Sequence, residues 1–417
     1  MFYGWYIVGA SSGIGLANAA TAISILTIFI GPMGDELGWT RTEFAGAASL
    51  GAILGAVLSP VIGWLFDRYS PRLVLVCGGL AIVLALMYLS VVHTLLGFFI
   101  AISVARISGQ GLIKVGVATS VAKWFQRFRG RAMGIVYFAE AAGFIILAPL
   151  TQLVMQVGDW RMTWLALGGV MFVIGVVPVA LIMRRQPADM GLALDGIVSG
   201  QRLVTTGHAP SDKPIEEEEA SWSTAQMVRT AAFWVLLASL FAISVAISGI
   251  ALHFVPHLTQ QGLSSQSAVS AISVMFGAGA VSALIIGVAG ERISLKLALV
   301  VAYLAVALSQ IILIYTNSVS DAYLFAVIHG ISTATVSIMS LLLWPHFYGT
   351  KSIGFVYGIN RAAQVGGYAI GPLIGGLVYD ATGSYRNALL CFAALAVFSA
   401  LLFLFARRPT NPATRPA

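Results

Sequence analysis

Four ionisable side chains lie deep inside long apolar stretches of this chain: Arg106, Lys114, Glu140 and Arg361. An ionised group near the centre of a bilayer is costly, so one that remains there usually has a partner or a function. Three of the four are basic and one is acidic, and Glu140 is the only carboxylate well inside an apolar stretch. We therefore expect a bound anion to balance the excess positive charge.

Arg361 is the first candidate for holding that anion. A guanidinium can bind a carboxylate through two parallel hydrogen bonds, which fixes its orientation as well as its charge. Asn360 and Gln364 flank Arg361 and could add hydrogen bonds. The alternative is an arginine that is bonded to backbone carbonyls or extends toward the membrane interface.

Arg106, Gln110 and Lys114 recur every four residues, so a regular helix would place them on one polar stripe. Arg106 either faces a translocation path, where it senses substrate or protonation, or forms a structural ion pair with Glu140. For Lys114 we favour a structural or gating role. If Glu140 is paired with Arg106 or Lys114 it stays ionised; if that pair opens in a dry environment, the neutral form is favoured and Glu140 could carry a proton.

The elements that position these side chains follow from the composition. The chain is 59% hydrophobic and 9% charged, with a mean hydropathy of +0.91, whereas soluble domains are about 25% charged. Apolar runs of about 20 residues cross a bilayer as helices, because only a helix satisfies its own backbone groups there. We predict an all-α membrane protein with twelve transmembrane helices, at 4–30, 43–66, 73–92, 95–121, 130–155, 162–183, 231–255, 267–289, 296–316, 322–345, 353–379 and 387–406.

The distribution of basic residues predicts the orientation. Of the 23 Lys and Arg residues, 17 fall in segments on the side of the two termini, and only Arg41, Arg161 and Arg386 fall on the other side. Basic residues are retained on the cytoplasmic side, so we expect both termini there, in a cytoplasmic (inner or plasma) membrane. The net charge of +7 then reflects topology and contact with lipid headgroups, and we expect no nucleic-acid partner.

The helices divide into two halves that repeat each other. Residues 185–229, with the acidic run 216–219, predict a cytoplasmic linker between bundles at 1–184 and 230–417. The repeat has an offset of 224 or 225 residues. It relates Gly63, Asp67, Arg68 and Arg72 to Gly287, Glu291, Arg292 and Lys296; Gly38 and Thr40 to Gly262 and Ser264; Gly158–Arg161 to Gly383–Arg386; and Ala148–Pro149 to Gly371–Pro372. His329 lies one residue from the position that repeats Arg106, which makes it a further candidate for the cavity wall.

The pattern Gly63-x-x-x-Asp67-Arg68-x-x-x-Arg72 resembles the cytoplasmic signature of the major facilitator superfamily, in which the acid and the arginines lock neighbouring helix ends. Within that superfamily the chain is similar to the monocarboxylate transporter and oxalate:formate antiporter branch. The similar stretches are 2–5, 36–41, 123–131, 185–192 and 255–264. The resemblance implies two pseudo-symmetric six-helix bundles, a cytoplasmic gate formed by Gly63, Asp67, Arg68, Arg72, Glu291, Arg292 and Lys296, and a substrate-contacting basic residue in the eleventh helix, where Arg361 lies.

The chain also departs from that branch. Its members typically carry an arginine inside the eighth helix, but here residues 268–289 contain no charge. A dicarboxylate held between two cations is therefore less well supported than a monocarboxylate anchored by Arg361.

These observations predict a secondary active transporter of a small organic anion resembling lactate, pyruvate or formate. It would work by alternating access, with proton symport or anion exchange. A carrier of a neutral solute or drug with the same fold is the alternative. The excess of buried cations disfavours a cationic-drug antiporter, and the linker is too short for the signalling domain of a sensor. No phosphate-binding loop, metal-ligand cluster or nucleophile elbow is present in the sequence, so we expect neither an enzyme nor a cofactor or metal, and we expect the chain to act as a monomer.

Overall fold

The computed structural model describes residues 2–196, 222–251, 253–290, 292–406 and 409. It is all-α, and the described residues contain no strand. Eleven of the described segments are long and apolar enough to cross a membrane. Most of the predicted linker, including the acidic run at 216–219, lies outside the described residues. The fold class predicted from composition is confirmed.

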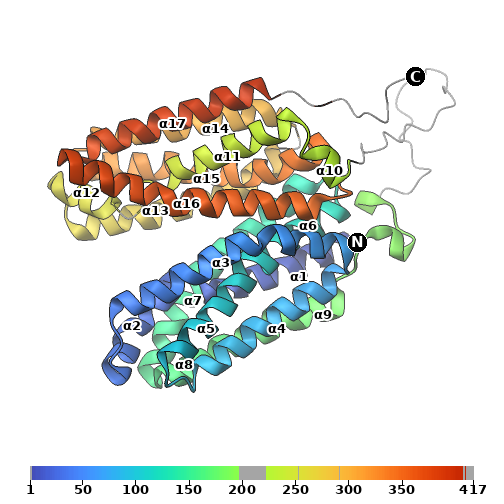
Figure 1. Ribbon diagram of the computed structural model, residues 1–417, viewed down its shortest axis with the longest axis horizontal. Helices are drawn as coiled ribbons and strands as arrows, with labels where there is room; N and C mark the ends of the chain where they lie inside the picture. The colour runs from blue at the N-terminus through green and yellow to red at the C-terminus, as the bar shows by residue number, and fades with distance from the viewer. Residues whose placement is uncertain (1, 197–221, 252, 291, 407–408, 410–417) are drawn as a thin grey trace.

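The first half forms one helical bundle, drawn in blue to green in Figure 1. Its elements are α1 (Gly4–Ala17), η1 (Asn18–Thr21), α2 (Ile23–Leu37), α3 (Arg41–Arg68), α4 (Pro71–Leu89), α5 (Leu95–Ile107), η2 (Ser108–Ile113), α6 (Lys114–Trp124), α7 (Arg129–Val157), α8 (Trp160–Val170), η3 (Met171–Val176) and α9 (Val177–Ile182). Two short 3₁₀ turns, η4 (Pro187–Met190) and η5 (Leu194–Gly196), follow it.

The second half forms the other bundle, drawn in yellow-green to red. Its elements are α10 (Thr224–Met227), α11 (Ala231–Ser248), α12 (Phe254–Gln260), α13 (Ser265–Ala289), α14 (Leu295–Ile314), α15 (Val319–Tyr348), α16 (Ile353–Thr382) and α17 (Tyr385–Phe405). The helix predicted at 353–379 is α16, a 30-residue helix with Arg361 in its first half. It is absent from the eleven apolar spans and packs along α3 of the first bundle.

Several predicted spans are not regular α-helices. The first continues to Leu37 and is interrupted by the 3₁₀ turn η1, where the Thr21 hydroxyl donates to the backbone carbonyl of Asn18 at 2.9 Å. Such local side-chain bonds compete with the helical pattern. The fourth and sixth spans contain the π-helical turns η2 and η3. The seventh is divided into α11 and α12.

The sequence repeat reappears as repeated backbone geometry. Gly38 and Gly262 both have left-handed φ angles, of 73° and 90°, a conformation that glycine adopts without strain. The side chains of Thr40 and Ser264 then accept hydrogen bonds from the backbone N–H groups of Glu43 and Ser267, which cap α3 and α13. The predicted duplication of the two halves is therefore confirmed at these positions.

The two halves meet closely at the end of the molecule where α1 begins (Figure 1). A Cβ atom added to Gly63 of α3 would clash with the carbonyl of Gly354 in α16, and one added to Gly287 of α13 would lie 2.7 Å from the carbonyl of Gly130 in α7. Gly63 and Gly287 are 224 residues apart, as are Gly130 and Gly354. Each half thus closes this end with the same pair of contacts, which small residues permit.

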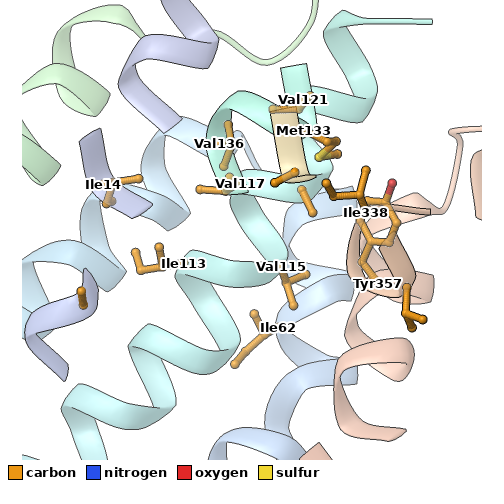
Figure 2. Close-up of a cluster of buried hydrophobic side chains, with 14 of the residues drawn as sticks. Ile14, Ile62, Ile113, Val115, Val117, Val121, Met133, Val136, Ile338 and Tyr357 are labelled. Carbon is orange, nitrogen blue, oxygen red and sulfur yellow. The ribbon is translucent and has the colours of Figure 1, made fainter. Parts of the chain in front are cut away.

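An apolar core continues through both halves at this end. Figure 2 shows Val117 and Val121 of α6 and Met133 and Val136 of α7 together with Ile338 from the second half. All five are buried. Because this core links the halves close to the polar residues of α6 and α7, it positions the site described next.

Candidate functional site

The polar residues of the fourth span lie along α5, η2 and α6. Arg106 is at the end of α5, Gln110 is inside η2, and Lys114 begins α6. The π turn shifts the register of the helix, and the three side chains contact three different elements. The predicted stripe exists along the helix, but it does not present a single common surface.

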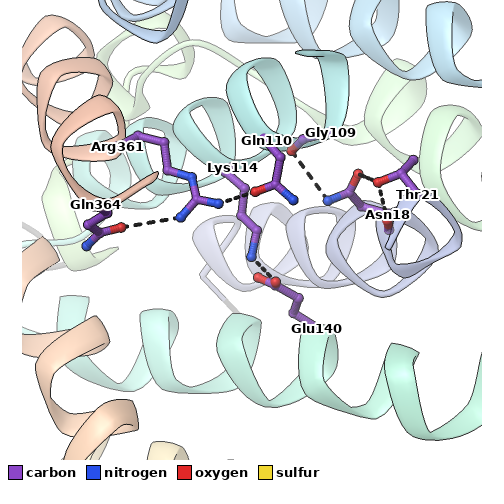
Figure 3. A network of polar contacts seen from close by, with 8 residues as sticks. All are labelled: Asn18, Thr21, Gly109, Gln110, Lys114, Glu140, Arg361 and Gln364. Carbon is purple, nitrogen blue, oxygen red and sulfur yellow. Dashed lines mark hydrogen bonds and ion pairs between the residues drawn. The ribbon is translucent and has the colours of Figure 1, made fainter. Parts of the chain in front are cut away.

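Lys114 forms an ion pair with Glu140 of α7 (Figure 3). Both side chains are partly buried, with 28% and 16% of their surface exposed. Of the two partners that the sequence left open for Glu140, the structure selects Lys114. The only deep carboxylate is therefore already used to neutralise a lysine of the same half.

Arg361 of α16 reaches across to the first half and donates to the Gln110 side-chain oxygen. Its second terminal nitrogen donates to the Gln364 oxygen at 3.4 Å, and no protein acceptor in the described part of the chain lies within hydrogen-bond distance of its Nε. The adjacent Asn360 is 2% exposed, and its side-chain oxygen has no donor among the described residues. Both amide neighbours are neutral, so they leave the charge of Arg361 unbalanced.

Arg106 also lacks an acidic partner in the described structure. One terminal nitrogen donates to the carbonyl of Thr21 at 3.1 Å, and its buried Nε has no acceptor. The side chain lines a small, mainly apolar pocket with Thr21 and Trp164 inside the first half. The ion pair between Arg106 and Glu140 that the sequence allowed is thus not formed.

The cations at this level repel one another. Arg361 lies close enough to both Arg106 and Lys114 for their charges to interact unfavourably. Within the described residues, one ion pair with Glu140 offsets this repulsion. The site is therefore suited electrostatically to an anion.

His329 contacts other residues. Its Nδ1 lies 3.0 Å from the Ser309 hydroxyl, its ring stacks on Phe325, and it is hydrogen bonded to the backbone of Ile247. These partners belong to α14, α15 and α11 of the second half. The structure accordingly gives His329 the environment of a packed core residue and does not bring it to Arg361.

Two tyrosines belong to the site although the sequence analysis did not select them. Tyr137 of α7 is hydrogen bonded to Ser337 of α15, across the two halves, and both Tyr137 and Tyr368 interact electrostatically with Arg361. Tyr137 precedes Glu140 by three residues and lies 224 positions before Arg361. The repeat offset was thus the available sequence signal.

The gate predicted at the end of α3 connects the halves through Asp67. Its carboxylate accepts the backbone N–H groups of Gly354 and Phe355, each at 2.9 Å, and lies 3.9 Å from Lys123. These N–H groups form the first turn of α16, where a negative charge is favourable. Asp67 therefore anchors the start of the helix that carries Arg361.

The other predicted gate residues have different environments. Arg68 lies over the Trp64 ring at 5.3 Å, and Lys296 donates to the carbonyl of Leu404 at 2.7 Å. Arg72 and Arg292 are exposed, and Glu291 lies outside the described residues. Only Asp67 of this set is shown to contact the opposite half. Elsewhere, the described residues contain no group of three His, Cys, Asp or Glu side chains that could hold a metal ion.

Comparison with known proteins agrees with this arrangement. The family model described as Major Facilitator Superfamily matches residues 12–359 and 271–417. The chain is 24% identical over 422 residues to "Monocarboxylate transporter 12" of Rattus norvegicus, covering 97% of this chain and 85% of that protein. It is 22% identical over 240 residues to the "Oxalate:formate antiporter" of Oxalobacter formigenes, covering 57% and 52%.

Two solved structures share the fold. The human organic anion transporter MFSD10 (TETRAN) superposes with a TM-score of 0.71 at 14% identity, covering 97% of this chain and 100% of that one. The proton:xylose symporter XylE gives 0.70 at 13% identity, covering 97% and 96%. At these identities the similarity bears on the fold alone.

Proposed function

Because this chain belongs to the major facilitator superfamily, we propose that it is a secondary active transporter of a small monocarboxylate resembling lactate, pyruvate or formate. It is a multi-pass membrane protein. The similarity to proteins named monocarboxylate transporters and oxalate:formate antiporter supports this class of substrate. In the proposal the membrane is the cytoplasmic one and both termini face the cytoplasm.

One observation carries the proposal: the acid of the central site is consumed by Lys114, while Arg361 and Arg106 are bonded to neutral acceptors only. Each guanidinium also retains an Nε donor without a protein acceptor in the described structure. A substrate carboxylate supplies both the missing charge and the missing acceptors. Arg361 is the proposed anchor, with Gln364 and Asn360 beside it, and Arg106 contributes to the positive potential.

Transport then proceeds by alternating access between the halves at 1–184 and 230–417, linked by 185–229. The glycine contacts and the Asp67 hydrogen bonds join the halves at the end of the termini, which we assign to the cytoplasmic side. In this proposal the structure represents the conformation closed toward the cytoplasm. Binding of substrate between Arg361 and Gln110 bridges the halves and favours their rearrangement.

The Lys114–Glu140 pair is the proposed coupling element. In a symport mechanism Glu140 accepts a proton when its contact with Lys114 opens, and the freed lysine attracts the substrate anion. In an exchange mechanism the pair stays closed and a counter-anion resets the carrier.

The test is uptake by proteoliposomes containing the purified protein, with labelled lactate, pyruvate and formate, labelled xylose as a neutral solute, and a cationic dye. We expect uptake of the acids, and a loss of about tenfold or more in apparent affinity for Arg361→Gln. The matched control is Arg229→Gln, which removes an exposed arginine outside the central site and leaves uptake unchanged. Uptake of xylose or dye without any acid refutes the anion assignment.

A pH jump separates the two coupling modes. Inward proton gradients accelerate uptake in a symporter, and Glu140→Gln removes that acceleration. Uptake that requires only an internal anion and is indifferent to the proton gradient excludes the proton-carrying role of Glu140.

A further inference from the structure

The first half contains a built-in carboxylate site at the end opposite the termini. Glu36, near the end of α2, accepts hydrogen bonds from Arg161 at 3.0 Å and from the Trp160 indole at 2.7 Å, and its other oxygen lies 2.7 Å from Arg161 Nη2. The Arg161 guanidinium lies over the Trp160 ring at 4.1 Å. Two nitrogen donors of an arginine and one of an aromatic ring therefore enclose a carboxylate.

The internal repeat places the corresponding residues of the second half at a second site. Gln260 occupies the position of Glu36 at the offset of 224, and Tyr385 and Arg386 occupy those of Trp160 and Arg161 at 225. The helix start is also repeated, because the side chains of Asp159 and Ser384 cap α8 and α17 in turn. The cation is kept, but the acid is replaced by an amide.

Gln260 does not take over the role of Glu36. Its side-chain nitrogen donates to the Tyr379 hydroxyl at 2.8 Å, and Tyr379 stacks on Tyr385 with a centroid separation of 4.2 Å. Among the described residues, no carboxylate oxygen lies within 4.0 Å of Arg386; Asp380 influences Tyr385 but forms no ion pair there. The second site thus has its arginine and lacks its anion.

A pocket is present at this place. It has an empty volume of about 640 Å³, including its open mouth, and is lined by Arg386, Tyr385, Ser384, Gln260, Gln261 and Tyr315. Pockets of this size hold small organic ligands. Its deepest histidine, His257, is 4% exposed and bonded to the Leu313 carbonyl, so the exposed charge in the pocket comes from Arg386.

We propose that this pocket is a second binding site, in which the carboxylate of a small organic acid occupies the place that Glu36 fills in the first half. The site is separate from the central one, and by the distribution of basic residues it lies on the outer side of the membrane. That its physiological ligand is the transported acid rests on the proposed function; that it binds a carboxylate rests on the comparison of the two halves. Its role is to collect the acid at the mouth of the carrier.

The experiment measures binding of L-lactate to purified full-length protein by saturation-transfer NMR in the Arg361→Gln background, where the central site is disabled. We expect one remaining lactate site. Adding Gln260→Glu restores the internal ion pair with Arg386 and weakens that site by about tenfold or more. Adding Gln260→Ala, which removes the amide without supplying an acid, leaves lactate binding in place.

The reverse change in the first half provides an independent variant. Glu36→Gln frees Arg161 and Trp160 and is expected to create an additional lactate site. The inference is overturned if Arg361→Gln protein binds no lactate, or if Gln260→Glu leaves its affinity unchanged. Uptake assays keep this separate from the proposed function: lactate binding at the pocket without uptake by the unmodified protein refutes only the function, and uptake without residual binding refutes only the second site.

Discussion

Replacing Asp67 by Asn is expected to open the end of the molecule where the termini lie. The Asp67 carboxylate accepts two backbone N–H groups of the opposite half, each at 2.9 Å. Hydrogen bonds to a charged group contribute about 1.5–3 kcal/mol each. Asparagine keeps one acceptor oxygen and presents an NH₂ group where the other oxygen was, so about one such bond is lost, or ~2 kcal/mol.

This loss applies only to the closed conformation, because the two N–H groups separate from α3 when the halves part. A difference of ~2 kcal/mol shifts the equilibrium between closed and open forms about 30-fold. A closed-to-open ratio of about 100:1 would then fall to about 3:1. The weaker attraction to Lys123, at 3.9 Å, shifts it further in the same direction.

The assay is pulsed electron resonance between spin labels at Tyr69→Cys and Lys351→Cys, which are exposed positions on opposite halves, with Cys77 and Cys391 replaced by Ser. We expect a longer-distance population in Asp67→Asn. Asp159→Asn is the matched control, because Asp159 caps α8 within one half by accepting Met162 N–H at 2.7 Å. It should lower thermal stability without changing the distances. Identical distributions in Asp67→Asn and the unmodified protein would refute the gating role.

Three further outcomes follow from the geometry. Gly63→Ala should also populate the open form, because its methyl group clashes with the facing carbonyl, whereas Gly277→Ala, which meets no atom within 4 Å, should not. Lys114→Gln and Glu140→Gln should each lower the thermal midpoint, with the double variant losing clearly less than the sum; additive losses would exclude a coupled pair. Burial lowers the pKa of His257 from its usual 6.5, so the unfolded chain binds the proton more readily, stability declines as pH falls below 6.5, and His257→Gln should flatten that decline in acid melts.

The sequence predicted the fold well because its signals are local and repeated. Hydropathy gives the spans, and the offset of 224 correctly related Gly38 and Thr40 to Gly262 and Ser264. The Lys114–Glu140 contact was one of two pairings allowed by charge. These features depend on residue type and on distance along one or two neighbouring helices.

The remaining features depend on how helices rotate and approach one another. The contact between Arg361 and Gln110 crosses the two halves, and no spacing rule specifies it. The anchor of Asp67 uses backbone N–H groups, which carry no sequence signature. His329 was selected from a repeat position that misses Arg106 by one residue, and one residue on a helix is a rotation of about 100°, enough to direct it into the core of the second half.

The two halves keep the same contacts but differ in charge, and that difference is what makes an anion carrier of a symmetric scaffold. Glycine contacts repeat at 224 residues on both sides of the closed end. At the same offset, however, Glu140 corresponds to Gln364 and Glu36 to Gln260, while Tyr137 corresponds to Arg361. In the first half each acid neutralises a neighbouring cation, Lys114 or Arg161. In the second half the acids are amides and the arginines remain, so the positive charge available to a substrate is concentrated on one side of the interface that opens and closes.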